Sequence, residues 1–143
     1  MKNLAIAVLI SSTFAFAQKP PVVTPPAPLP VPAPLVFKSL KEGMQDMSAK
    51  LKVISMQSKD AKQNISSKKL SLSLADSVSA SKKFLPKSAI DSASQVLYAK
   101  MMDETIDLAK QLADAFDQNN NAKATDLLSK MSQQKTDGHT KFK

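Results

Sequence analysis

The sequence contains no cysteine and no tryptophan, and it has one tyrosine and two glycines in 143 residues. Without cysteine the chain forms no disulfide, carries no lipid on cysteine and attaches no c-type haem through a C-x-x-C-H motif. It has to be held together by its core, by a partner or by a non-covalent cofactor. It also lacks a nucleophile motif, a glycine-rich phosphate loop and a second histidine for a metal triad. We therefore do not expect an enzyme.

Positive charge exceeds negative charge, with 20 basic and 12 acidic residues and a formal net charge of +8. Every basic residue is a lysine, and arginine is absent. Because arginine reads base edges and aromatic rings stack on single strands, this composition argues against a nucleic-acid partner. A lysine-rich surface instead favours acidic partner proteins or anionic envelope polymers. The alternative is that the lysines are scattered over the surface and only solvate the exposed faces of helices.

The N-terminal region has the pattern of an export signal. Lys2 precedes an apolar run at residues 4–10, and Ala15-Phe16-Ala17 forms a small-x-small cleavage site, so we predict a signal peptide at residues 1–17. Its apolar part is shorter than the ~20 residues that a membrane-spanning helix needs, and we expect no transmembrane segment. Residues 18–36 include KPPVVTPPAPLPVPAPL, which predicts a polyproline II linker.

The remaining residues, 37–143, show helical periodicity and predict four amphipathic helices at about 37–56, 60–83, 88–116 and 122 onward. Short connections between them predict an all-α, antiparallel, up-down-up-down four-helix bundle, which we expect to be a monomer. The apolar positions expected to face the core are Leu40, Met44, Met47, Leu51 and Ile54; Ile65, Leu70, Leu72, Leu74 and Val78; Ile90, Leu97, Met101, Leu108, Leu112 and Ala115; and Leu127, Leu128 and Met131.

Two residues with metal-binding side chains are brought to one end of this bundle by its topology. Met44 lies at the start of the first helix, and His139, the only histidine, lies at the end of the fourth. In an up-down-up-down bundle these two ends are neighbours. Taken singly, a methionine on an apolar stripe fills the core and a histidine near a terminus is solvated.

The stretch LKEGMQDMSAKLKVI, residues 40–54, resembles the first helix of the cytochrome b562 family. In the same register Met44 falls on that family's methionine ligand, His139 on its histidine ligand, and Phe142-Lys143 on its closing aromatic-basic pair. The resemblance implies a periplasmic electron-transfer protein, not an enzyme, with one non-covalent haem b held by Met44 and His139 as axial ligands. For an electron carrier, the lysine-rich surface would favour acidic redox proteins as partners through long-range attraction.

The resemblance assigns further residues to the haem pocket. It implies that Leu40 and Met47 wall one haem face, that Tyr98 and Met102 match two aromatic residues of the pocket, and that Lys135 pairs with a propionate. An ordinary exposed lysine is an equal interpretation of Lys135. Residues 56–93 match the family poorly.

Gly138 decides whether the site can form, because glycine often follows a helix end. If the fourth helix ended there, His139 would leave the bundle. The alternative function is a haem-free envelope bundle that binds a partner or an anionic surface. A third hypothesis is a copper site made of methionines and histidine.

Overall fold

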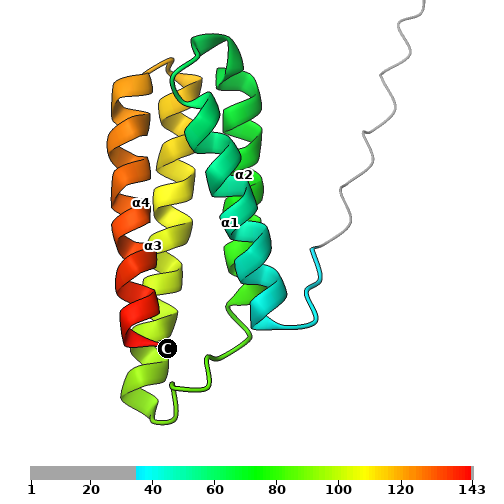
Figure 1. Cartoon of the computed structure of the whole chain (residues 1–143), viewed down its shortest axis with the longest axis vertical. Helices are drawn as coiled ribbons and strands as arrows, with labels where there is room; N and C mark the ends of the chain where they lie inside the picture. Colours follow the sequence, from blue (N-terminus) through cyan, green and yellow to red (C-terminus); the bar gives the residue numbers. More distant parts are fainter. Residues whose placement is uncertain (1–34, 143) are drawn as a thin grey trace, which may run out of the picture. The chain divides into compact units, whose positions relative to one another are not determined.

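The computed structural model describes residues 35–142. The predicted signal peptide and residues 18–34 of the predicted linker lie outside the described residues. The described part contains four α-helices and no strand: α1 (Leu40–Gln57), α2 (Asn64–Ser81), α3 (Ser92–Asp117) and α4 (Asn121–Lys141), with a 3₁₀ turn, η1 (Ala61–Gln63), before α2. Each helix packs against the next and α4 returns to α1, which confirms the predicted up-down-up-down bundle (Figure 1).

Polar side chains fix where the helices begin. Ser39 accepts a hydrogen bond from the backbone N–H of Glu42 at the start of α1, and Asn120 accepts one from Lys123 at the start of α4. Asp91 caps α3 through the N–H of Ser94, at 2.8 Å. The third helix therefore begins at Ser92, four residues later than the sequence predicted, because a capping residue follows the apolar Ile90.

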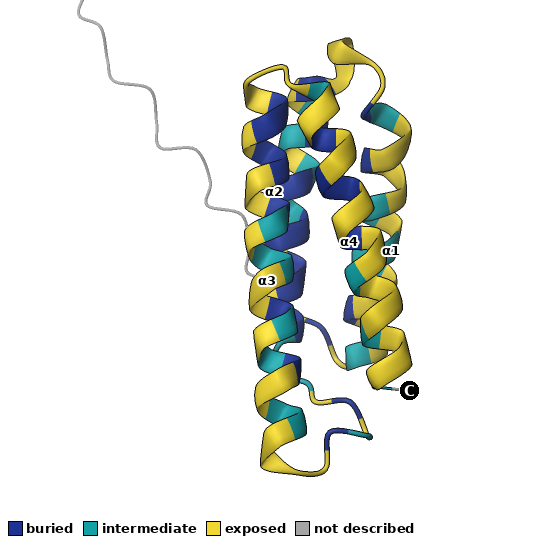
Figure 2. Cartoon of the chain, turned by 90° about the vertical axis from the view of Figure 1, so that its left-hand side faces the viewer, coloured by how far each residue is buried: buried dark blue, intermediate teal, exposed yellow. Residues whose placement is uncertain are grey.

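The core follows the predicted stripe in α4, follows it in α1 except at Met44, which is 39% exposed, and departs from it in α2 (Figure 2). Ile54 is fully buried, Leu40, Met47 and Leu51 are partly buried, and the three apolar positions predicted for α4 are buried: Leu127, Leu128 and Met131. In α2 the prediction was partly wrong, because Ile65 is 74% exposed and Leu72 is 45% exposed. The buried face of this helix consists largely of small polar residues, Ser67, Ser71, Ser77 and Ser81, beside Leu74, Ala75 and Val78.

The prediction for α3 was out of register in its first half. Ile90 is 84% exposed and Leu97 is 37% exposed. Ile90 lies before the first residue of α3, and Tyr98 and Met102, which follow the predicted core positions Leu97 and Met101, are buried instead. Alanine at position 109, which is fully buried, lets α3 approach its neighbours closely there, so the buried stripe continues through small residues that a search for large apolar residues passes over.

An amide cluster closes the bundle at the end where α1 meets α2 and α3 meets α4. Asn64 Nδ2 donates to Asn119 Oδ1 and to Asn121 Oδ1, both at 3.0 Å, and Asn121 Nδ2 donates to the Ser58 carbonyl at 2.7 Å. Asn119 adopts a φ of 53°, in the left-handed region that asparagine tolerates. The two connections at this end are thereby fastened to each other.

Candidate functional site

A cavity of about 400 Å³ lies toward the opposite end of the bundle and is lined by residues of all four helices. Its volume is within the ~300–1,000 Å³ that small-molecule and cofactor sites occupy. Five of the seven methionines of the chain line it: Met44, Met47, Met101, Met102 and Met131. The other lining residues are Leu40, Lys41, Gln45, Ser48, Leu51, Leu74, Val78, Pro86, Tyr98, Thr105, Gln134, Lys135, Gly138, His139 and Phe142.

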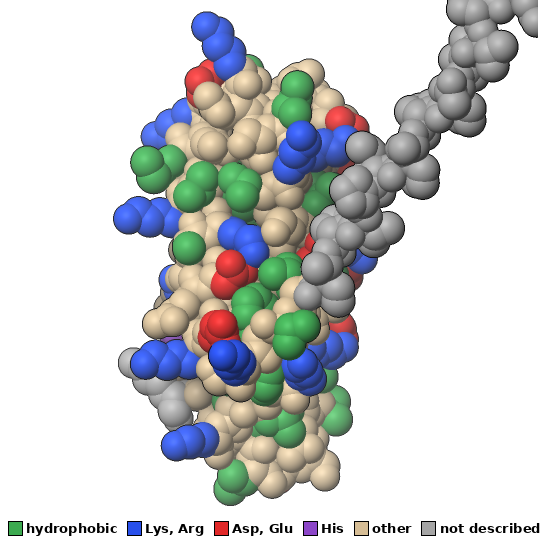
Figure 3. All heavy atoms as spheres, turned by 90° about the vertical axis from the view of Figure 1, so that its right-hand side faces the viewer, with side chains coloured by type: hydrophobic (Ala, Val, Ile, Leu, Met, Phe, Trp, Pro, Cys, Tyr) green, Lys and Arg blue, Asp and Glu red, His purple; other side chains and the backbone are tan. Residues whose placement is uncertain are grey.

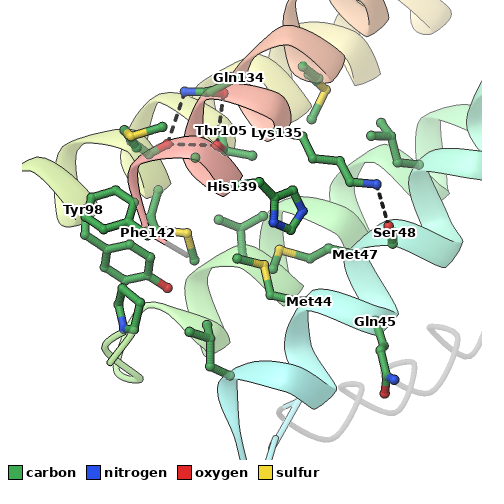
Figure 4. A pocket seen from close by; sticks show the side chains of 18 of the residues that line it. Met44, Gln45, Met47, Ser48, Tyr98, Thr105, Gln134, Lys135, His139 and Phe142 are labelled. Atoms are coloured by element: carbon green, nitrogen blue, oxygen red, sulfur yellow. Dashed lines mark hydrogen bonds between the residues drawn. The ribbon is translucent and has the colours of Figure 1, made fainter. Parts of the chain in front are cut away.

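The structure brings all of the predicted site residues to this one cavity. Met44, Met47 and Leu40 come from α1, Tyr98 and Met102 from α3, and Lys135 and His139 from α4. Figure 4 shows the side chains of Met44 and His139 directed into the same space from the two facing helices. Met44 is 39% exposed and His139 is also exposed, so both lie near the cavity mouth.

Gly138 does not end α4. The helix continues to Lys141, the Phe142 N–H donates to the Gly138 carbonyl at 2.9 Å, and no described glycine has a positive φ. A Cβ at position 138 would lie 3.5 Å from the Cε of Met101, an ordinary contact. His139 therefore occupies the last turn of the helix, with its backbone in helical geometry, and stays on the bundle.

Tyr98 forms part of the inner wall. It is 3% exposed, and its ring packs edge-on against Phe142 with centroids 5.5 Å apart and an interplanar angle of 83°. Its hydroxyl is buried and has no hydrogen-bond partner among the described residues. Burial raises the pKa of Tyr98 to about 12, so the phenol stays neutral and keeps an unused donor at the cavity.

Lys135 bridges the seam between α4 and α1 by donating from Nζ to the Ser48 hydroxyl at 2.9 Å (Figure 4). On the α3 side, the Thr105 hydroxyl donates to the Gln134 Oε1 at 3.0 Å, and Gln134 Nε2 donates to the Met101 carbonyl at 3.2 Å. These bonds hold α4 beside α3 along one wall. No functional role was predicted for Ser48, Thr105 or Gln134, because an uncharged polar residue at the border of an apolar stripe is their only signal in the sequence.

Part of the wall comes from the segment in which the sequence showed little similarity to a known family. Leu74 and Val78 of α2 are both almost fully buried, and Pro86, in the connection to α3, is buried as well. Periodicity predicted Leu74 and Val78 as core residues, which is confirmed, but not that they face a cavity. Pro86 was expected only to break the chain between helices.

The cavity residues suit a large apolar ligand that contains a metal. Thioether sulfur and imidazole nitrogen are the two axial ligands found in Met/His cytochromes. The wall is mostly apolar, and it offers a lysine and an unused phenol donor to polar groups at the periphery of a ligand. In the described residues, no group of three or more His, Cys, Asp or Glu side chains is placed to hold a bare metal ion, and no helix is long and apolar enough to cross a membrane.

Comparison with known proteins agrees with this geometry. A family model described as Cytochrome b562 matches residues 39–143, a range that includes all four helices. Searches of curated proteins and of solved structures each found no match. The family consists of electron-transfer haemoproteins that are not typically enzymes. The chain belongs to the cytochrome b562 family, and this membership implies a b-type haem and a role in electron transfer.

Proposed function

We propose that the protein is an exported, periplasmic electron carrier that binds one haem b without covalent attachment, with Met44 and His139 as its axial ligands. The observation that carries the proposal is that these two side chains, 95 positions apart in the sequence, line one cavity from α1 and α4. When bound, the haem supplies a metal centre that exchanges single electrons.

Each ligand type contributes a different property. His139 and Met44 would hold the haem iron, and the soft thioether of Met44 would favour the reduced metal and so raise the reduction potential. With both side chains bound to the iron, the protein would leave no ligand position for oxygen or a substrate. This arrangement favours electron transfer over bond chemistry.

The remaining wall residues position the group and exclude water. Leu40, Met47 and Met102 offer apolar surface, and flexible methionine side chains adapt to the outline of a ligand. Lys135 can exchange its hydrogen bond with Ser48 for a charge-assisted bond to a propionate. The predicted signal peptide (1–17) and linker (18–36) fit an exported protein whose haem-binding domain is residues 37–143.

The experiment that tests the proposal is a haem titration of the full mature chain, followed by visible spectra of the oxidised and reduced forms. We expect the sharp reduced bands of a six-coordinate b-type centre, lost in Met44→Ala and in His139→Ala. Met56→Ala is the matched control, because Met56 is 73% exposed and does not line the cavity. Bands unchanged by both ligand substitutions would refute the assignment, and failure to bind haem would favour a haem-free envelope bundle.

Copper binding is a second candidate, favoured by the five methionines around the cavity. Thioether sulfur is a soft ligand that suits cuprous ion. Anaerobic competition for Cu(I) against a chromophoric chelator separates the two candidates. Tight Cu(I) binding that depends on Met44 and Met47, together with weak haem binding, would favour copper.

A further inference from the structure

A second hollow adjoins the cavity along the seam between α1 and α4. It is lined from these two helices by Lys52, Ser55, Leu128 and Ser132, together with three residues that also line the cavity: Ser48, Leu51 and Lys135. The hydrogen bond from Lys135 to Ser48 crosses the seam at the border of the two hollows. The two hollows therefore adjoin along this seam, which we call the α1–α4 groove, and α1 and α4 are the least closely packed neighbours of the bundle.

All charged side chains that line this groove are lysines. They are Lys41, Lys52 and Lys135, and no aspartate or glutamate lines either hollow. Among the described residues, the ion pairs join other lysines to Asp46, Asp103, Glu104 and Asp117. The three groove lysines make no ion pair in that part of the chain, so their positive charge is not neutralised locally.

Lysines also project from other faces, as Figure 3 shows for one side of the bundle. Two features distinguish the groove from those faces. It is hollowed, and it contains Met44 and His139, both exposed at the cavity mouth. A partner seated on the groove would lie against the edge of the cavity, where a bound redox group is nearest to the surface.

We propose that the α1–α4 groove is the docking face for an acidic electron-transfer protein, whose carboxylates pair with Lys41, Lys52 and Lys135. The inference rests on the proposed function and adds the surface through which it operates. Complementary charge steers the encounter and fixes its orientation. A second copy of this chain is a poor occupant, because a symmetric contact would set the groove lysines of one copy against those of the other.

Lys52 provides a clean test, because it lines the outer hollow but not the cavity, so its substitution leaves the haem wall intact. The matched control is Lys69 on α2, which is exposed, lines neither hollow and makes no described ion pair. Lys52→Glu and Lys69→Glu change the net charge equally. Any difference between them reports the location of the charge and not its amount.

Two measurements on the full mature chain use these variants. In the first, the haem-loaded reduced protein is oxidised by ferricyanide, an anion, or by tris(phenanthroline)cobalt(III), a cation, at rising ionic strength. We expect Lys52→Glu to slow the ferricyanide reaction at low salt by at least about threefold and to reduce its salt dependence, with a smaller effect of Lys69→Glu. The cobalt reaction should not slow. Equal effects of the two variants would overturn the docking face.

The second measurement does not depend on haem and therefore separates failure of this inference from failure of the proposed function. Binding of poly-L-glutamate, a mimic of an acidic protein surface, is compared with binding of phosphatidylglycerol vesicles. We expect poly-L-glutamate binding to weaken more in Lys52→Glu than in Lys69→Glu. If the selective loss appeared only with vesicles, the groove would be assigned to an anionic membrane surface and the protein-docking proposal would be wrong.

Discussion

Replacing the two glycines by alanine should change the stability of the bundle in opposite directions. Both lie inside α-helices, where alanine is favoured over glycine by about 1 kcal/mol. At Gly138 the added methyl would meet only Met101 Cε at 3.5 Å. Gly138→Ala should therefore raise the free energy of unfolding by up to ~1 kcal/mol.

At Gly43 the added methyl would clash with Ser81 and would lie close to Phe37. Its Cβ would lie 2.0 Å from the Ser81 Oγ, 3.0 Å from the Ser81 Cβ and 3.4 Å from the Phe37 Cδ2. The hydroxyl can rotate away, but the Ser81 Cβ is fixed to α2, so the helices must separate. Overpacking of this kind costs about 1–3 kcal/mol, which leaves a net loss of up to about 2 kcal/mol for Gly43→Ala after the helix gain of about 1 kcal/mol is subtracted.

Urea unfolding of the haem-free protein, followed by far-ultraviolet circular dichroism, measures both changes in one experiment. The double variant Gly43→Ala/Ser81→Gly removes the opposing side chain and should recover part of the lost stability, beyond the sum of the single effects. If Gly43→Ala stabilised the protein as much as Gly138→Ala, the close approach of α1 and α2 would be refuted. A destabilising Gly138→Ala would refute the open space beside Met101.

Three further predictions concern polar groups. Burial alone would raise the pKa of Asp46, but hydrogen bonds from Lys50 and Ser77 hold that pKa below its usual range. Asp46 therefore stabilises the folded protein at pH values above its pKa in the unfolded chain, and this stabilisation is lost as pH falls through its lower pKa in the folded protein. Asp46→Asn should flatten the acid branch of a plot of urea midpoint against pH. Burial raises the pKa of Tyr98 from its usual 10.0 to about 12, so the free energy of unfolding should fall by roughly 3 kcal/mol as pH rises between these values; ultraviolet titration reads this directly, since Tyr98 is the only tyrosine, and ionisation near 10 in the folded protein would contradict its burial. Asn121→Ala removes the donor to the Ser58 carbonyl and leaves buried Asn64 without one of its hydrogen-bond partners, which should lower the free energy of unfolding by about 2 kcal/mol in the same urea assay. An unchanged free energy of unfolding would mean that the amide cluster does not stabilise this end of the bundle.

The sequence predicted the fold because helix periodicity and topology depend on few residues. Leu127, Leu128 and Met131 are large, apolar and correctly spaced, and all three are buried. The joint placement of Met44 and His139 followed from the order of the helices alone, and both line the cavity. Their role as ligands remains a prediction that the haem titration tests.

The buried face of α2 could not be predicted from apolar periodicity, because serine counts as polar in such a pattern. The hydroxyl of Ser71 donates to the carbonyl of Ser67, four residues earlier, at 2.8 Å. A hydroxyl paired with its own helix can be buried with little penalty. Ile65 was predicted as a core residue because it is apolar, but it is exposed, since apolar periodicity does not register how much space lies between the helices.

The hydrogen bond between Lys135 and Ser48 could not be predicted from the sequence either. The two residues are 87 positions apart and belong to the first and last helices. Similarity to a family assigned Lys135 to a haem propionate, but nothing in the sequence indicated which uncharged residue faces it across the seam. Only the three-dimensional structure shows that Lys135 donates a hydrogen bond to Ser48.

The two ends of the bundle differ in what holds them together, and this difference predicts where haem should stabilise the protein. One end is fastened by the amide cluster of Asn64, Asn119 and Asn121. The other is a cavity with flexible methionine walls and an unpaired Tyr98 hydroxyl. Segments with fewer packed contacts open locally with lower free energy than the core.

Haem binding should therefore slow hydrogen exchange mainly in the first turns of α1 and the last turns of α4, where the cavity lies. A ligand present at 100 times its Kd stabilises the form that binds it by about 2.7 kcal/mol, enough to slow exchange there by roughly a hundredfold. Amides of α2 and α3 near the amide cluster that exchange through local openings should change little, because such openings leave the cavity intact. Equal protection along all four helices would mean that the bundle opens only as a whole and that its cavity end is no weaker than the other.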